Sequence, residues 1–193
     1  MCSLFYVDAS TLRDIRCLTG ERELNENHAE TGDVRPSLRA VILAGAYGRL
    51  KMKTMKWGFP SYDKTHLLIN ARTETVMEKR SFSDSVLHRR CVIPAKAFYE
   101  WDSDKNKAMF TLPDGSSLYM AGFYSIFGEE KRFVILTTQA NDSMKKVHDR
   151  MPLILPKELV RDWIFDDDRA VEILKRPSPM LEKYQEYEQL TLF

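Results

Sequence analysis

Cys2 is the residue whose position suggests the most unusual chemistry in this chain. Methionine aminopeptidases remove Met1 when the second residue is small, and cysteine qualifies, so we expect a mature chain that begins at Cys2. An amine with a pKa of about 8 and a thiol with a pKa of about 8.5 then stand on adjacent carbons. The amine can form a Schiff base with an aldehyde, and the thiol can trap it as a durable thiazolidine ring. The alternative is that a cysteine at this position has no chemical role.

A second candidate segment is Leu68-Ile69-Asn70-Ala71-Arg72-Thr73-Glu74. If it is extended, Asn70, Arg72 and Glu74 project from one face of the strand. An apolar strand that ends in alternating polar groups is typical of one that delivers side chains into a site. The planar fork of Arg72 suits a phosphate group. The alternative is a surface ion pair between Arg72 and Glu74.

Glu100 is an isolated acid within the aromatic segment Phe98-Tyr99-Glu100-Trp101. Such surroundings remove water from a carboxyl group and favour general acid–base chemistry. Trp101 could stack on a nucleic-acid base. The alternative is an edge-strand acid among core aromatic residues.

His148 lies between an expected helix and an expected strand, next to Asp149 and Arg150. A histidine in this setting suits proton transfer near neutral pH. A structural histidine with satisfied hydrogen bonds is the alternative.

The composition is that of an ordinary globular protein, with 44% hydrophobic and 30% charged residues. No apolar run approaches the ~20 residues of a membrane span, so we expect no membrane segment. The three cysteines form no CxxC pair, which argues against a zinc site or disulfide framework and indicates a reducing cytoplasm. The net charge is only +1, but basic residues cluster in a pattern that allows one basic groove on a two-faced surface. The clusters are Arg49 to Lys56, Lys79-Arg80, His88-Arg89-Arg90 and Lys145 to Arg150.

Hydrophobic patterning predicts a single α+β domain over residues 1–193, with a mixed β-sheet or barrel-like core and peripheral helices. The core is expected within residues 1–165, with a loop near 19–33 and a loose tail after Pro177. Expected strands cover 38–44, 67–70, 91–93, 97–101, 108–112, 118–126, 132–136 and 151–155, and expected helices cover 8–18, 81–88, 141–147, 156–164 and 167–175.

Taken together, several segments resemble the SOS-response-associated peptidase (SRAP) family of abasic-site-processing proteins. They occur in the family's order and span most of residues 1–165. The matching text is Met1-Cys2, Trp57-Gly58, Ile69 to Glu74, Lys79 to Phe82, Arg90 to Ala95, Phe98 to Trp101, Thr137 to Asn141 and His148 to Pro152.

The resemblance implies covalent capture of abasic sites in single-stranded DNA, with Cys2 as the nucleophile that forms the thiazolidine. It implies that Asn70 holds the N-terminus and the sugar, that Glu100 assists opening of the sugar ring, and that His148 assists the Schiff-base chemistry. It further implies phosphate contacts from three arginines and base contacts from two tryptophans, namely Arg72, Arg80, Arg150, Trp57 and Trp101. No cofactor or metal is implied. We expect a monomer that works in the cytoplasm and associates with the nucleoid when it engages DNA.

Ser3 and Leu4 depart from the Gly-Arg that usually follows the cysteine in this family. The change removes one expected DNA contact and alters the backbone near the sugar. Two other functions remain open from the sequence. One is a cysteine peptidase that uses Cys2 and His148 with Glu100 or Asn70. The other is a non-covalent sensor of damaged single-stranded DNA.

Overall fold

The computed structural model describes residues 2–21 and 31–185. Its helices are α1 (Ala9–Thr19), α2 (Arg80–His88), α3 (Val160–Phe165), α4 (Asp167–Ile173) and the short 3-10 helix η1 (Lys157–Leu159). Its strands are β1 (Leu4–Val7), β2 (Gly32–Val34), β3 (Arg39–Ala46), β4 (Arg49–Trp57), β5 (Phe59–Pro60), β6 (Leu67–Leu68), β7 (Asn70–Arg72), β8 (Arg90–Ala95), β9 (Ala97–Trp101), β10 (Lys107–Thr111), β11 (Leu118–Phe127), β12 (Glu130–Gln139), β13 (Arg150–Pro152) and β14 (Glu182–Gln185).

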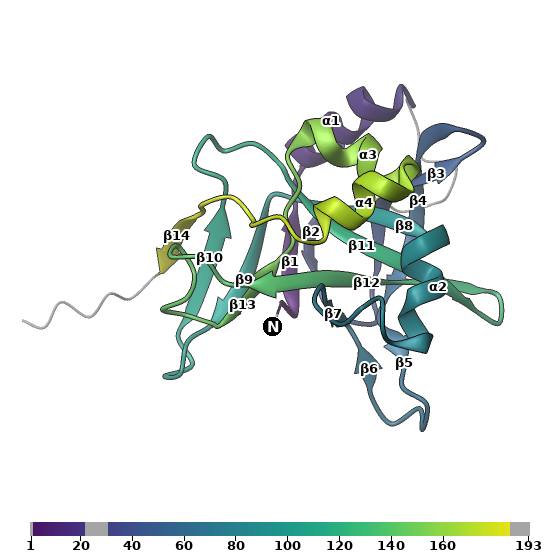
Figure 1. The fold of residues 1–193 in the computed structure, drawn as a ribbon. Coiled ribbons are helices and arrows are strands. Elements are labelled where there is room, and N and C mark those ends of the chain that lie inside the picture. The colour runs from purple at the N-terminus through teal and green to yellow at the C-terminus, as the bar shows by residue number, and fades with distance from the viewer. Residues whose placement is uncertain (1, 22–30, 186–193) are drawn as a thin grey trace, which may run out of the picture.

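Five of these strands close into a barrel (Figure 1). The order is β11-β8-β3-β4-β12, and β12 pairs again with β11. Most neighbours are antiparallel, but β12 runs parallel to both β4 and β7. Full closure removes the exposed strand edges that an open sheet would present. The parallel pairing sets β7 beside β12, where Asn70 lies opposite Ile135 and Arg72 opposite Thr137.

A second, antiparallel sheet has the order β14-β10-β9-β1-β2. β1 pairs with β9 so that Leu4 lies opposite Tyr99 and Phe5 opposite Phe98. Extending this register toward the N-terminus brings Cys2 and Ser3 level with the end of β9. The sheet therefore carries the start of the chain to the strand that holds Glu100.

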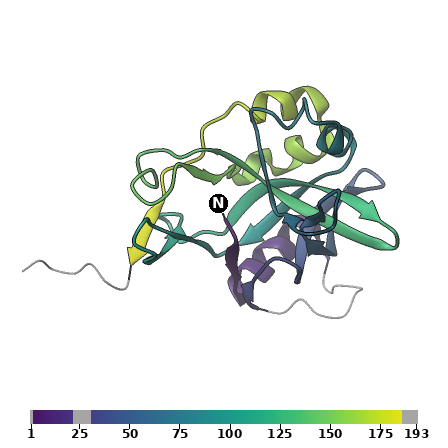
Figure 2. The same cartoon turned by 90° about the horizontal axis from the view of Figure 1, so that it is seen from below.

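The helices cover the barrel from opposite sides. Figure 2 shows α3 and α4 gathered on one side and α1 on the other. Asp8 caps α1, because its carboxylate accepts a hydrogen bond from the backbone N–H of Thr11 at 2.7 Å. Gly20 ends the helix in the left-handed conformation. Since β1 runs directly into α1, this cap anchors the strand that begins next to Cys2.

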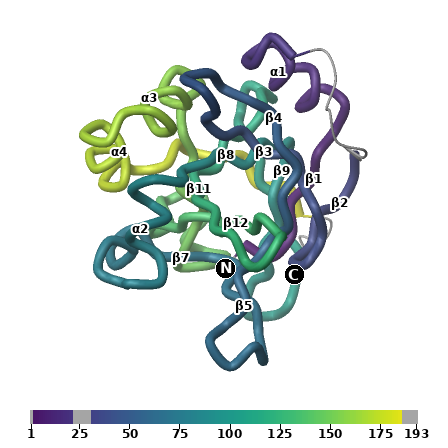
Figure 3. The backbone as a smooth tube through the Cα atoms, turned by 90° about the vertical axis from the view of Figure 1, so that its right-hand side faces the viewer, coloured from purple at the N-terminus to yellow at the C-terminus, as the bar shows by residue number. Residues whose placement is uncertain are grey.

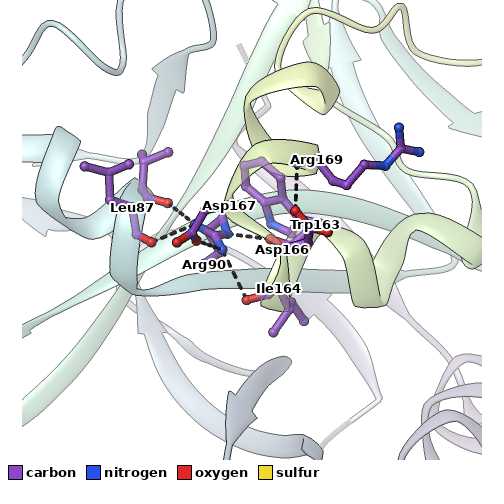
Figure 4. A network of polar contacts seen from close by, with 8 residues as sticks. Leu87, Arg90, Trp163, Ile164, Asp166, Asp167 and Arg169 are labelled. Atoms are coloured by element: carbon purple, nitrogen blue, oxygen red, sulfur yellow. Dashed lines mark hydrogen bonds and ion pairs between the residues drawn. The ribbon is translucent and has the colours of Figure 1, made fainter. Parts of the chain in front are cut away.

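Arg90 joins α2 to α3 inside the protein (Figure 4). Its guanidinium donates to the backbone oxygens of Leu87 at 2.7 Å and Trp163 at 2.5 Å, and it pairs with Asp167 at 2.6 Å. These oxygens belong to the last turns of two helices, where carbonyls have no partner within the helix. Arg90 is thus a buried cap shared by α2 and α3 and contributes nothing to a basic surface, which corrects the expected cluster at residues 88–90.

Most of the expected elements are confirmed, with several differences. The expected strand at 151–155 ends at Pro152, and the expected helix at 156–164 is η1 followed by α3. The expected helix at 141–147 is wrong, because residues 142–147 form consecutive turns. The N–H of Ala140 donates to the Asp149 carbonyl oxygen at 2.9 Å, which closes this connection between β12 and β13. The expected strand at 67–70 is two short strands, β6 and β7. The segment after Pro177 is ordered through Gln185, since β14 pairs with β10; residues 186–193 lie outside the described residues, as do 22–30 of the expected loop.

Candidate active site

The Cys2 side chain is buried, with 1% of its surface exposed. Its sulfur lies 3.8 Å from the backbone oxygen of Leu4. Burial, and next the negative charge of Glu100, raise the pKa of the Cys2 thiol well above its usual range. The thiol is therefore neutral near pH 7, and thiolate chemistry is disfavoured at this position.

Asn70 holds the backbone of Cys2. Its side-chain Nδ2 donates to the Cys2 carbonyl oxygen at 2.8 Å, across 68 residues of sequence. Figure 3 shows the same relation at the level of the fold, since the start of the chain lies beside β7. The Oδ1 atom of Asn70 is buried and accepts no hydrogen bond from the described residues. A buried acceptor of this kind is costly unless a donor arrives, so it is suited to an N–H or O–H group in the site.

Glu100 lies on β9, where it is only 3% exposed. Phe98 and Ala108, its neighbours along and across the sheet, are buried as well. The register of β1 with β9 brings the start of the chain to the part of β9 that holds Glu100, whose charge helps to raise the pKa of the Cys2 thiol. The structure thus brings together Cys2, Asn70 and Glu100, which come from three separate parts of the sequence.

His148 is partly buried in the connection between β12 and β13. Its ring Nδ1 accepts a hydrogen bond from the backbone N–H of Arg150 at 2.9 Å. A carboxylate oxygen of Asp149 lies at the same distance, 2.9 Å, from this nitrogen. The backbone bond requires Nδ1 without a proton, whereas Asp149 would favour Nδ1 with one, so the two partners compete for one atom.

Two of the arginines expected at the phosphates are exposed, namely Arg72 at the end of β7 and Arg80 at the start of α2. Trp101, at the end of β9, is partly exposed. These positions leave the three side chains accessible to solvent.

Trp57 does not occupy the position expected for a residue that contacts bases. Its side chain is 0% exposed, stacks on Phe133 with ring centroids 6.1 Å apart, and donates its indole N–H to the Ile69 oxygen at 3.0 Å. A base cannot reach a ring that is enclosed in this way. Trp57 is a core residue, and its tie to Ile69 supports the position of Asn70.

Arg150 differs from Arg72 and Arg80, because its guanidinium is bound to another side chain of the protein. It is 8% exposed, and both of its terminal nitrogens donate to the Glu74 carboxylate at 2.8 Å. One of them also donates to the Thr137 oxygen at 2.6 Å. Both terminal nitrogens of Arg150 are thus bound within the protein, and the phosphate contact expected of Arg150 stays a prediction. The alternative pairing of Glu74 with Arg72 is replaced by the pair of Glu74 with Arg150.

Tyr62 is an exposed aromatic residue that the sequence reasoning passed over. It lies in the turn of the β5–β6 hairpin, which leads directly into Asn70. Gly58, with φ of 102°, allows the chain to leave β4 and enter this hairpin. The signal in the sequence was an aromatic residue within a Gly- and Pro-marked turn, where no core position is expected.

Within residues 2–21 and 31–185, no group of three or more His, Cys, Asp or Glu side chains is arranged to hold a metal ion. No helix in this part of the chain is long and apolar enough to cross a membrane.

Comparison with known proteins places this chain among relatives of one kind. The abasic site processing protein YoaM of Bacillus subtilis (strain 168) is 35% identical over 159 residues, which are 74% of this chain and 69% of YoaM. The abasic site processing protein YedK of Escherichia coli (strain K12) is 29% identical over 177 residues, covering 85% of this chain and 79% of YedK.

Solved structures share the fold. A protein from Bacteroides thetaiotaomicron superposes with a TM-score of 0.80 at 21% identity, covering 97% of this chain and 93% of the other. A protein from Bordetella bronchiseptica superposes with a TM-score of 0.79 at 24% identity, covering 95% and 99%. The profile of the SOS response associated peptidase (SRAP) family matches residues 1–191. The resemblance seen in the sequence is confirmed, and the chain belongs to the SOS response associated peptidase family.

Proposed function

We propose that this protein captures abasic sites in single-stranded DNA by forming a covalent thiazolidine through Cys2 after removal of Met1. The observation that carries the proposal is the arrangement around Cys2, whose backbone is held by Asn70 and whose thiol shares a buried site with Glu100. The names of YoaM and YedK as abasic site processing proteins support the substrate.

The neutral thiol supports a sequence in which the amine reacts first. The Cys2 nitrogen adds to the C1′ aldehyde of the ring-opened sugar, and loss of one water gives an imine. The sulfur then adds to the imine carbon, and the thiol proton passes to the nitrogen. The product is a thiazolidine, and the whole reaction releases one water without oxidation or reduction.

The surrounding residues have distinct roles in this proposal. Glu100 serves as the buried acid and base that opens the sugar ring and moves the thiol proton. His148 assists proton transfer during formation and reversal of the imine. The unoccupied Oδ1 of Asn70 accepts an N–H of the reacting amine, which directs the nitrogen lone pair toward the aldehyde.

The exposed side chains around the site would hold the DNA strand. Arg72 and Arg80 bind phosphates, while Trp101 and Tyr62 offer aromatic faces to unpaired bases. Capping the aldehyde suits single-stranded DNA, because cutting there would break the only template. An imine that escapes the thiol would promote strand cleavage, so weak lyase activity is a side reaction. In this role the protein acts as a monomer in the cytoplasm, at the nucleoid.

The peptidase alternative, which the family's description names, is less favoured by the environment of Cys2. A cysteine peptidase needs a thiolate, and here burial and Glu100 both oppose ionisation of the thiol. Cleavage of a peptide substrate that is lost in Cys2→Ser would support that alternative.

A crosslinking assay with matched cysteine variants tests the proposal. Protein beginning at Cys2 is mixed with a single-stranded oligonucleotide that carries one abasic site, and the products are separated under denaturing conditions. We expect a heat-stable adduct from the wild type and from Cys17→Ala, whose thiol is exposed on α1. Cys2→Ala and protein with a blocked N-terminus should give none. An adduct that survives Cys2→Ala would contradict the proposal, and equal non-covalent binding of intact and abasic strands without any adduct would favour a sensor.

A further inference from the structure

The Glu74–Arg150 pair joins an exposed carboxylate to a buried guanidinium. The two hydrogen bonds between the carboxylate and the guanidinium are each 2.8 Å, in the bidentate geometry that arginine favours. The bond from Arg150 to the Thr137 oxygen is a third fixed point. Hydrogen bonding from Arg150 lowers the pKa of Glu74, so the carboxylate stays ionised and the pair persists at neutral pH.

This pair links the two segments that carry Asn70 and His148. Glu74 follows β7 by two residues, and the N–H of Thr73 donates to the same Thr137 oxygen at 2.9 Å. Arg150 begins β13, two residues after His148. The bond between Glu74 and Arg150 therefore fixes the end of β7 and the His148 segment relative to each other beside β12.

The backbone of Arg150 also acts on the imidazole ring. Its N–H donates to Nδ1 of His148 at 2.9 Å, which leaves the ring proton on Nε2. Asp149 lies 2.9 Å from the same Nδ1 and favours the opposite tautomer, with the proton on Nδ1. The Arg150 backbone thus favours one tautomer of His148, and the Asp149 carboxylate favours the other.

We infer that Glu74 is a positioning residue that, through Arg150, holds His148 in the tautomer with the proton on Nε2. Nothing in this step requires Glu74 to touch DNA. Its consequence for crosslinking rests on the proposed function, because only there does His148 transfer protons. The tautomer itself is a property of the free protein and is measured without any substrate.

Nitrogen NMR of the histidine rings in the free protein provides the first test. Long-range proton–nitrogen spectra at alkaline pH, where histidine rings are neutral, distinguish the two tautomers directly. His148→Gln assigns the signals among the four histidines of the chain. Glu78→Gln is the matched control, because Glu78 is an exposed carboxylate in the same turn as Glu74.

We expect the proton on Nε2 of His148 in the wild type and in Glu78→Gln. In Glu74→Gln we expect a substantial population with the proton on Nδ1, facing Asp149. Backbone spectra show that the variant is folded. A wild-type ring with its proton on Nδ1, or a Glu74→Gln ring identical to the wild type, would overturn the inference.

The second test measures the crosslinking rate at saturating DNA together with non-covalent affinity. Glu74→Gln should slow crosslinking about 10-fold, less than the roughly 10²- to 10⁴-fold that a general acid or base itself contributes, because His148 is misplaced and not removed. Affinity for an intact strand should stay near that of the wild type. Arg150→Lys should have a similar effect. The double variant should be no slower than either single variant, because both changes disrupt the same Glu74–Arg150 pair. Additive losses would assign the two residues separate roles and contradict the inference.

The two tests separate two kinds of failure. If the wild type forms no adduct, the proposed function fails, while the tautomer measurement still decides the role of Glu74. If the wild type forms the adduct but Glu74→Gln leaves both the tautomer and the rate unchanged, the inference fails and the proposed function stands.

Discussion

At the residue scale, the site depends on how a few side chains share their hydrogen bonds. Asn70 uses its amide nitrogen to hold the Cys2 carbonyl and keeps its amide oxygen for a donor in the site. Burial raises the pKa of the Cys2 thiol, so in the proposed reaction the amine attacks first. Arg150 is bound to Glu74 through its side chain, and its backbone N–H donates to the ring of His148.

Replacing the amide of Asn70 tests whether its hydrogen bond to the Cys2 carbonyl positions the N-terminus. In Asn70→Asp, a carboxylate oxygen replaces the nitrogen donor and faces the Cys2 carbonyl, so repulsion displaces the N-terminus. We expect crosslinking to slow about 100-fold, as a misplacement of about 1 Å can cause. Asn106→Asp, in the exposed loop between β9 and β10, is the control and should react as the wild type does. A single-turnover rate unchanged by Asn70→Asp would show that this bond does not position Cys2.

At the scale of elements, the site residues are held by short strands and helix ends. β1 brings Cys2 to β9, and α1 fixes the far end of β1 through the Asp8 cap. On the other side of the barrel, Arg90 caps both α2 and α3 from within. The order of the site therefore depends on caps that lie outside it.

The Asp8 cap should give a pH-dependent contribution to stability. Partial burial raises the pKa of Asp8, but hydrogen bonds from Thr11 and Ser10 outweigh this and lower it below the usual value of 3.8. Because the folded pKa is depressed, the stabilisation is present above pH 3.8 and is lost as the pH falls through the folded pKa. Asp8→Ala should cost about 1 kcal/mol at neutral pH.

Asp8→Asn is the control for this prediction, because asparagine caps a helix without titrating. Urea denaturation across acidic pH should show the wild type losing stability relative to Asp8→Asn below pH 3.8. A constant difference between the two proteins at every pH would contradict the charged-cap explanation.

Arg90 should be far more important for stability than an exposed arginine nearby. Arg90→Met leaves several buried carbonyl groups without a donor, and we expect a loss of about 3 kcal/mol in the free energy of unfolding. Arg169→Met removes only exposed ion pairs, which water and salt screen, and should cost far less than Arg90→Met. Equal losses in denaturant titrations of the two variants would show that the shared cap is not important.

The sequence alone predicts most of the local structure but not its long-range pairing. Alternation of apolar residues and turn residues predict β8 to β12 and the capped helix α1 because these signals are local. Closure of the barrel depends on the parallel pairing of β12 with β4 and β7, which no local pattern specifies. The pairing of Arg150 with Glu74, 76 residues apart, and the complete burial of Trp57 have the same origin. Residue types identified the candidates, whereas only the fold shows which are accessible.

At the scale of the whole molecule, the near-zero net charge of +1 makes DNA binding depend on local positive side chains. Several basic residues are neutralised by acids in the structure, including Lys51 by Glu21 and Arg132 by Glu130. The exposed Arg72 and Arg80 remain as the expected phosphate contacts. Binding to single strands should therefore show a modest dependence on salt.

Changing either arginine should reduce that dependence in a defined way. Arg72→Gln and Arg80→Gln should each weaken binding to an intact single strand and reduce the slope of log affinity against log salt by about 0.7. Arg89→Gln should leave the slope unchanged, because Arg89 is already paired with Asp84. Fluorescence anisotropy over a range of salt concentrations gives the slopes, and equal slopes for all three variants would contradict this assignment of contacts.

The most direct test of the central claim is intact-mass spectrometry of the adduct between abasic single-stranded DNA and protein that begins at Cys2. A thiazolidine predicts a mass equal to protein plus oligonucleotide minus one water, formed without a reducing agent and located on the N-terminal peptide. It also predicts that both the amine and the thiol of Cys2 are consumed. An adduct that requires borohydride for its isolation, that maps to a lysine, or that leaves the Cys2 thiol free would contradict the account.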